Sequence, residues 1–271
     1  MPTRRPIGIF DSGIGGLSVL RHIRAQLPHE DLLYFADAGY APYGNKTEAD
    51  IVQRTLVIAH FLVTHGAKIV VVACNTATAA AIAALRMRYP TLPVVGVEPG
   101  LKPAAAMTRC KTVGVLATES TLSSKNFHLL REQVTTATNV RFLLQACPGL
   151  ATQIENAQLD SAATALLVQR FVTPLINQGA DTLVLGCTHY PFVQPLIEQC
   201  TAHLTSKPIA IIDTGEAVAR QLQRLLLQFD LRNTAQGSGT LTAFTTGQVA
   251  SLAAACATLL HLAPVVLQVN A

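Results

Sequence analysis

The chain has 271 residues, which at about 150 residues per domain is enough for just under two domains. Half of the residues are apolar and only 13% are charged, so the chain can bury a sizeable core and is not of the disordered class. Aromatic residues make up 5%, tryptophan is absent, and the net charge is +4 with scattered arginines. Neither a nucleic-acid surface nor a membrane-binding patch is therefore indicated.

Short apolar runs of β-type residues alternate with helical patterns along the chain. This alternation predicts strand–helix–strand units and a parallel sheet, and the continuous apolar character of the runs is typical of sheets covered on both faces. The expected strands are Ile7–Phe10, Leu32–Ala36, Ile69–Ala73, Val94–Val97, Val113–Leu116, Val140–Leu144, Leu183–Gly186 and Ile209–Ile212.

Helical spacing is clearest in two of the intervening segments. Apolar residues recur on one face over residues 52–63, and the pattern stops at Gly66. The same spacing over residues 218–229 predicts a second helix, with Asp213 as its N-cap. Glu98 follows an expected strand in the same way, so we interpret it as a cap residue too.

Two regions bear on the location of the protein. Residues 252–269 are apolar enough to suggest a membrane span, but His261 and Pro264 interrupt them, so we expect a helix followed by a short strand. The apolar run near the N-terminus is too short for a secretory signal. None of the six cysteines forms a CxxC pair, which gives no support to a zinc ribbon or a thioredoxin-like motif, and their density is far below that of disulfide scaffolds. We therefore expect a reduced, cytoplasmic protein without membrane contact.

The chain also resembles itself. A Gly-Ala pair lies eight residues before Cys74 and another lies eight residues before Cys187, and the strands between are alike. Three pairs of segments match in the same order, namely IVVVACNT with TLVLGCTH, IGIFDS with VGVLAT, and PVVGVEP with PIAIIDT. This internal repeat predicts two similar parallel-sheet α/β lobes related by pseudo-symmetry, with the active site in the cleft between them.

The expected lobe boundaries follow from prolines and glycines that interrupt regular secondary structure. Proline and glycine between residues 99 and 103 indicate a crossing to the second lobe, and a return is expected near residue 212. The first lobe is then residues 1–98 with 212–271, and it carries Asp11 and Cys74. The second lobe is residues 99–211, and it carries Cys187 and His189.

Cys74 and Cys187 are the most informative side chains. Each directly follows an expected strand and precedes small polar residues, at the sheet edge where ligands of α/β proteins bind. The stretch after Cys74 is a strong helix former, and free N–H groups at a helix N-terminus favour a thiolate. A single cysteine in such a place is often only a buried core residue, but two at matched positions favour a catalytic role. The remaining cysteines, which lack this context, are interpreted as structural: Cys110, Cys147, Cys200 and Cys256.

Other candidate residues are weaker when taken alone. The turn Asp11-Ser12-Gly13-Ile14-Gly15-Gly16 fits neither nucleotide-binding glycine pattern, so it is either a small-ligand site or a simple cap by Asp11. Pro42-Tyr43-Gly44 reads as an ordinary turn. His189 stands two residues after Cys187, whereas Glu155 shows nothing by itself.

Two thiols in one cleft allow two kinds of chemistry. One thiolate can be a nucleophile that is activated by a base such as His189. Alternatively, a thiolate and a thiol on opposite sides of a substrate can act as base and acid, which moves a proton across a carbon and inverts its configuration.

Five motifs carry a resemblance over most of the chain: DSGIGGLSV (11–19), YFADAGYAPYGNKT (34–47), ACNTATA (73–79), GVEPGLKPA (96–104) and LGCTHYPFV (185–193). With these motifs the chain resembles the glutamate racemase family of cofactor-independent amino-acid racemases. The resemblance implies interconversion of L- and D-glutamate by two-base proton transfer at the α-carbon, which supplies D-glutamate for peptidoglycan.

The resemblance also implies residue roles. Cys74 would take the α-proton from D-glutamate and Cys187 from L-glutamate, with Asp11 assisting Cys74, His189 assisting Cys187, and Glu155 supporting His189. The substrate would be held by Asp11, Ser12, Pro42, Tyr43, Gly44, Asn75, Thr76, Thr118, Thr121, Thr188 and His189.

The resemblance implies no cofactor and no metal. Pyridoxal catalysis would need a Schiff-base lysine, and the low lysine content argues against it. The expected partner is glutamate, and the low surface charge leaves area for a homodimer. Three alternatives stay open: an aspartate racemase with the same mechanism, a hydrolase or isomerase with one nucleophilic cysteine, and a non-catalytic binding protein for a dicarboxylic amino acid.

Overall fold

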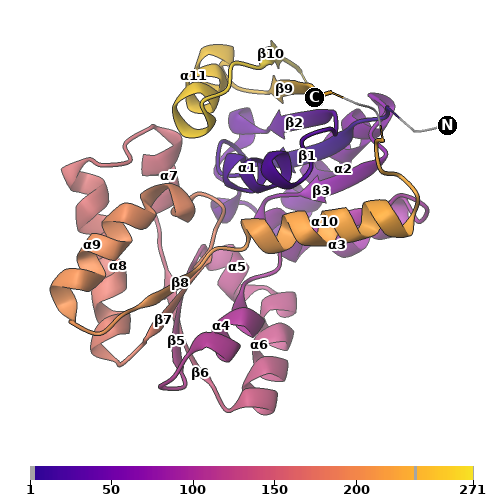
Figure 1. Ribbon diagram of the computed structural model, residues 1–271. Coiled ribbons are helices and arrows are strands. Elements are labelled where there is room, and N and C mark those ends of the chain that lie inside the picture. Colours follow the sequence, from indigo (N-terminus) through magenta and orange to yellow (C-terminus); the bar gives the residue numbers. More distant parts are fainter. Residues whose placement is uncertain (1–3, 235–236, 271) are drawn as a thin grey trace. The chain divides into compact units, whose positions relative to one another are not determined.

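The computed structural model describes residues 4–234 and 237–270 and divides the chain into two compact units. The first unit comprises Met1–Val97 and Gly215–Ala271, and the second comprises Glu98–Thr214. Each unit is built on one parallel sheet with helices packed against it (Figure 1). The predicted fold class, two parallel-sheet α/β lobes, is confirmed.

In the described part of the first unit, six parallel strands form a sheet in the order β10-β9-β2-β1-β3-β4. Its strands are β1 (Ile7–Asp11), β2 (Leu32–Ala36), β3 (Ile69–Val72), β4 (Val94–Gly96), β9 (Leu241–Thr245) and β10 (Val265–Gln268). Two groups of helices pack on this sheet, α1 with α10 and α11, and α2 with α3 (Figure 1). They are α1 (Leu17–Gln26), α2 (Glu48–Thr64), α3 (Asn75–Arg88), α10 (Gly215–Gln228) and α11 (Val249–Leu260).

The second unit has a sheet of four parallel strands among its residues, all of them described, in the order β6-β5-β7-β8. These are β5 (Thr112–Ala117), β6 (Arg141–Ala146), β7 (Thr182–Gly186) and β8 (Ala210–Ile212). Helix α4 packs with α6, and α8 packs with α9. The helices are α4 (Leu101–Met107), α5 (Glu119–Ser123), α6 (Lys125–Thr138), α7 (Leu150–Glu155), α8 (Ala162–Asn177) and α9 (Gln194–Leu204).

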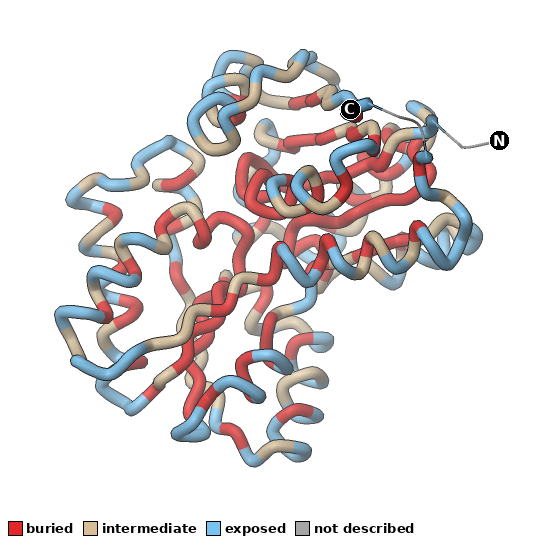
Figure 2. The backbone as a smooth tube through the Cα atoms, in the orientation of Figure 1, coloured by how far each residue is buried: buried red, intermediate tan, exposed pale blue. Residues whose placement is uncertain are grey.

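The strand orders support the internal repeat. The first sheet contains β2-β1-β3-β4 and the second is β6-β5-β7-β8, so the self-matches pair β1 with β5, β3 with β7 and β4 with β8. The paired strands β1, β3, β5 and β7 are buried at every residue, as the red tube in Figure 2 shows, which explains the continuous apolar runs at their centres. Gly66 and Gly179 follow α2 and α8 with φ of +87° and +89°, a conformation that favours glycine.

Most sequence-based elements lie within a residue or two of their observed bounds, and three expectations need comment. Helix α10 begins at Gly215, two residues after Asp213, and α4 has Gly100 as its N-cap, so Asp213 and Glu98 are not N-caps of these helices. Strand β9 has no counterpart among the expected strands. The apolar stretch 252–269 does contain the end of a helix, α11, and then a short strand, β10.

None of the helices in the described residues combines the length and apolar character needed to cross a membrane.

A buried ion pair fixes the amino ends of the first sheet. Lys68, just before β3, places its Nζ 2.6 Å from Oε2 of Glu30, just before β2, and both side chains are almost fully buried. The other Glu30 oxygen accepts the backbone N–H of Asn233 at 2.7 Å. Because breaking a buried pair leaves an uncompensated charge, this contact constrains the start of both strands.

Candidate active site

In the first unit, the candidate residues lie where β1 and β3 end. Asp11 is the last residue of β1, is fully buried, and accepts the Gly13 N–H at 2.9 Å through its carboxylate. The Tyr34 hydroxyl donates to the Gly13 carbonyl at 2.7 Å. A Cβ on Gly16 would lie 2.6 Å from the Asp11 Cβ, so the glycine permits the turn to close over the strand end.

Cys74 is the N-cap residue of α3. Its sulfur accepts the Ala77 N–H at 3.4 Å and lies 3.8 Å from the Ser12 hydroxyl oxygen. An amide donor at a helix N-terminus stabilises a thiolate, so the expected environment for Cys74 is present. The side chain of Asn75 is buried, and neither its nitrogen nor its oxygen has a hydrogen-bond partner in the described residues. An unpaired buried amide beside a thiol suits a polar ligand, because leaving it unpaired is costly.

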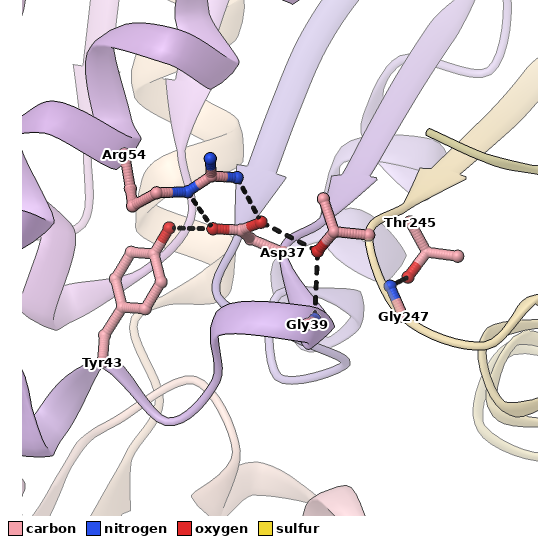
Figure 3. A network of polar contacts seen from close by, with 7 residues as sticks. Asp37, Gly39, Tyr43, Arg54, Thr245 and Gly247 are labelled. Atoms are coloured by element: carbon pink, nitrogen blue, oxygen red, sulfur yellow. Dashed lines mark hydrogen bonds and ion pairs between the residues drawn. The ribbon is translucent and has the colours of Figure 1, made fainter. Parts of the chain in front are cut away.

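The loop at residues 41–46, termed the Tyr43 loop, follows the end of β2. Tyr43 is buried, and its hydroxyl donates to the Asp37 carboxylate at 2.6 Å (Figure 3). Burial, together with the nearby Asp37 charge, raises the pKa of Tyr43, so its hydroxyl stays a donor. Because that donor is used and the Tyr43 side chain is buried, the groups that this residue offers a ligand are those of its backbone, as is true of Gly44, which has no side chain.

In the second unit, three candidates form a hydrogen-bonded chain. Cys187 directly follows β7, and its sulfur lies 3.5 Å from Nδ1 of His189. Nε2 of His189 lies 2.6 Å from Oε1 of Glu155, the last residue of α7. The sequence gives no local sign of the Glu155 contact, which spans 34 positions.

The electrostatics of this chain favour a charged imidazole. Burial opposes protonation of His189, but the neighbouring Cys187 thiolate and the Glu155 carboxylate outweigh it and hold the pKa of His189 well above its usual value. A protonated His189 donates toward both neighbours, so Cys187, His189 and Glu155 can hold a thiolate and imidazolium pair in place.

The threonine candidates also lie in the second unit. Thr118 is the N-cap of α5 and accepts the Thr121 N–H at 3.2 Å, and the two hydroxyl oxygens are 2.9 Å apart. Thr188, which lies between Cys187 and His189 in the sequence, is also buried. The structure therefore groups Asp11, Ser12, Cys74, Asn75 and Thr76 with the Tyr43 loop in one unit. It groups the candidates Thr118, Thr121, Glu155, Cys187, Thr188 and His189 in the other.

Near Cys187, nothing in the sequence indicates a role for Tyr190, whereas Cys147 is interpreted from the sequence as structural. The Tyr190 hydroxyl is buried without a hydrogen-bond partner of good geometry in the described residues, and burial with the adjacent Cys187 and Cys147 thiols raises its pKa. Burial likewise raises the pKa of Cys147, which agrees with an inert thiol. Asp37 and Arg54, which hold the Tyr43 loop, also gave no signal, although Asp37 lies inside a quoted motif.

A comparison with models of protein families shows which family this chain belongs to. The model described as Asp/Glu/Hydantoin racemase matches residues 7–222, which is most of the chain. The chain belongs to the Asp/Glu/Hydantoin racemase family. The match spans β1 to α10 and thus contains every candidate residue discussed above.

Relatives within this racemase family are close in sequence and fold. A glutamate racemase of Ectopseudomonas mendocina is 53% identical over 238 residues, which is 88% of each chain. The glutamate racemase of Francisella tularensis, solved in complex with D-glutamate, has a TM-score of 0.85 at 27% identity and covers 99% of this chain and 98% of its own. That of Escherichia coli, solved with L-glutamate and an activator, has a TM-score of 0.82 at 31% identity over 97% of each chain.

Proposed function

We propose that this protein is a glutamate racemase that interconverts L- and D-glutamate with Cys74 and Cys187 as its two bases. The observation that carries the proposal is the matched placement of two cysteines, each at the carboxyl end of the corresponding strand, β3 or β7. Relatives named glutamate racemase, solved with one or the other enantiomer, support the choice of substrate.

The proton transfers balance as follows. The Cys187 thiolate takes the α-proton of L-glutamate and becomes a thiol, while the Cys74 thiol gives its proton to the opposite face of the carbanion. The product is D-glutamate, and Cys74 is left as a thiolate, ready for the reverse reaction. Each thiol thus serves as acid in one direction and as base in the other.

The surroundings of each thiol fit these tasks. The α3 N-terminus favours the Cys74 thiolate that remains after D-glutamate forms, and Asp11 lies at the neighbouring strand end. His189, held by Glu155, stabilises the Cys187 thiolate that attacks L-glutamate. We propose that Ser12, Asn75, Thr76, Thr118, Thr121, Thr188 and the backbone of the Tyr43 loop bind the carboxylates and ammonium group. We further propose that the product serves peptidoglycan synthesis.

The test is racemisation in D₂O without added cofactor. We expect D-glutamate made from L-glutamate to carry solvent deuterium at the α-carbon, because the thiol that donates differs from the thiolate that accepts. Failure to exchange or invert either enantiomer refutes the proposal, and faster turnover of aspartate would favour an aspartate racemase.

Single-cysteine variants separate the two-base mechanism from a one-base mechanism. C74A should lose racemisation but retain slow α-deuteration of L-glutamate, since Cys187 can still remove and return the proton on one face. C187A should do the same with D-glutamate. C110A is the matched control, because Cys110 is exposed, and it should keep full activity. Inversion by either C74A or C187A at the wild-type rate contradicts the assignment.

A further inference from the structure

A network of polar side chains surrounds Asp37, the residue that directly follows β2. Asp37 is fully buried and receives four hydrogen bonds (Figure 3). Its Oδ2 accepts from the Tyr43 hydroxyl at 2.6 Å and from Arg54 Nε at 3.0 Å. Its Oδ1 accepts from Arg54 Nη2 at 2.7 Å and from the Thr246 hydroxyl at 2.9 Å. Four donors occupy both oxygens, so this carboxylate is not available to bind a ligand or to move a proton.

The donors come from separate parts of the first unit. Arg54 lies on α2, Tyr43 lies in the Tyr43 loop, and Thr246 directly follows β9. Thr246 also accepts the Gly39 N–H at 3.0 Å, and the Arg54 guanidinium lies 3.7 Å from the centre of the Tyr40 ring. The network thus ties the turn at residues 37–46 to a helix on one side and to a strand end on the other.

The charges of the pair are well matched. Burial opposes the charge of Arg54, but its hydrogen bonds to Asp37 and the Asp37 charge outweigh this, so the pKa of Arg54 is raised. The Arg54 side chain is only 12% exposed. A two-pronged contact between a guanidinium and a carboxylate has a fixed geometry, so it orients groups more strictly than a single ion pair does.

Tyr43 connects the Asp37–Arg54 pair to the candidate site. The Tyr43 ring belongs to the same buried cluster as Cys74 and Ala77, at the start of α3. Its hydroxyl end is held by Asp37, and its backbone forms the short helical turn Tyr43–Asn45 at the candidate substrate site. Movement of Asp37 would therefore move both the Tyr43 loop and the packing around Cys74.

We propose that Asp37 and Arg54 are positioning residues that fix the Tyr43 loop for glutamate binding, an inference that rests on the proposed function. They act through Tyr43 and do not touch the substrate. Preorganisation of this kind lowers KM because the loop does not lose freedom when substrate binds, and it keeps the substrate aligned with the reacting thiols.

Another buried ion pair of the same unit, Glu30 with Lys68, provides a matched control. Glu30 and Lys68 are as deeply buried as Asp37 and Arg54, and their contact is equally short, but they lie before the strands begin. E30Q and D37N each remove one buried charge from one sheet. A purely structural role for Asp37 predicts the same loss of thermal stability in both variants and no selective change in KM.

The experiment compares D37N, R54K, Y43F and E30Q with the wild type. We expect D37N to raise KM for both enantiomers about tenfold and to lower kcat/KM roughly 10- to 100-fold. R54K should show an intermediate effect because lysine keeps the charge but not the two-pronged contact. Y43F, which loses one hydrogen bond and folds most safely, should raise KM severalfold. E30Q should lower the melting temperature but leave KM within twofold of wild type.

Amide hydrogen exchange gives a readout that does not depend on activity. Peptides covering residues 38–47 should exchange faster in D37N and Y43F than in wild type, and they should be unchanged in E30Q. If D37N and Y43F keep the wild-type KM and exchange rates, this inference fails while the proposed function stands. If the wild type neither binds nor racemises glutamate, the proposed function fails and the inference falls with it.

Discussion

Replacing Glu155 by glutamine tests the chain of contacts behind Cys187. The amide keeps the size of the carboxylate and can still accept a hydrogen bond from His189 Nε2, now 2.6 Å away, so the change removes mainly a charge. A hydrogen bond to a charged group contributes about 1.5–3 kcal/mol when its partner is buried. The side chain of Glu155 is only 19% exposed, so solvent screens this contribution little.

The expected effect on catalysis follows from that free energy. If the lost contact supports the transition state, kcat/KM falls about 10- to 150-fold, since each 1.36 kcal/mol is a factor of ten. The factor must be the same from L-glutamate and from D-glutamate, because the two enantiomers have equal free energy and the equilibrium constant is one. Initial rates from both enantiomers, followed by circular dichroism, measure it.

The pH profile gives a second, independent readout. Loss of the carboxylate removes one cause of the raised His189 pKa, so the alkaline limb of the kcat/KM profile should move to lower pH in E155Q. E132Q on the exposed face of α6 serves as the control for a lost surface charge and should match wild type. The reasoning is refuted if kcat/KM of E155Q stays within twofold of wild type and the alkaline limb of its pH profile does not move.

The difference in stability between wild type and E155Q should also depend on pH. The folded pKa of His189 lies above its unfolded value of about 6.5, so the stabilisation is fully present below that pH and disappears as pH rises through the folded pKa. We therefore expect E155Q to melt below wild type at pH 6, with the difference shrinking in alkaline buffer.

Three further predictions concern the scaffold. K68M should lower the free energy of unfolding by about 3–5 kcal/mol in urea titrations, because Glu30 is left charged and buried, and replacing both partners by apolar residues should recover much of it. D181N should be less stable than wild type at pH 7. Burial opposes the Asp181 charge, but hydrogen bonds from the Thr108 hydroxyl and the Cys110 and Arg109 amides outweigh it and lower the pKa of Asp181 to about 2. The stabilisation is therefore present above about pH 4 and is lost as pH falls through 2, where the melting temperatures of D181N and wild type should converge. G16A should reduce activity with glutamate, since a Cβ at Gly16 would lie 2.6 Å from the Asp11 Cβ and 2.9 Å from the Tyr34 hydroxyl oxygen.

Much of the fold could be predicted from the sequence because its central strands are continuous. β1, β3, β5 and β7 are buried at every residue, and their centres are apolar on both faces, so each stands out in the sequence as a short continuous apolar run. Strand β9 was not predicted because threonines interrupt the apolar residues of LTAFT and its first two residues are only partly buried, so it lacks a continuous apolar run. Asp213 was misplaced because an acidic residue near a helix start is common, and only the backbone shows which residue is the cap.

The site was less accessible to sequence reasoning. Cys74 and Cys187 stood out because the repeat places each of them after an equivalent strand and before small polar residues. The resemblance to racemases, and no local pattern, suggested Glu155, since its partner His189 lies 34 positions further along and the contact exists only after α7 packs beside the turn following β7. Arg54 gave no signal for the same reason, since a helix residue can pair with a loop 17 positions earlier only in the folded unit.

The pairing of β2 with β9 has a consequence for the order of events during synthesis. The second unit is one continuous stretch, Glu98–Thr214, and can begin to fold as soon as it leaves the ribosome. The first unit is interrupted: β2 must wait for β9, which is made some two hundred residues later, and Asp37 waits for Thr246. The thiol at Cys187 thus acquires its surroundings before the chain is finished. The Tyr43 loop beside Cys74 is thus held in its final form only once β9 and Thr246 have been made.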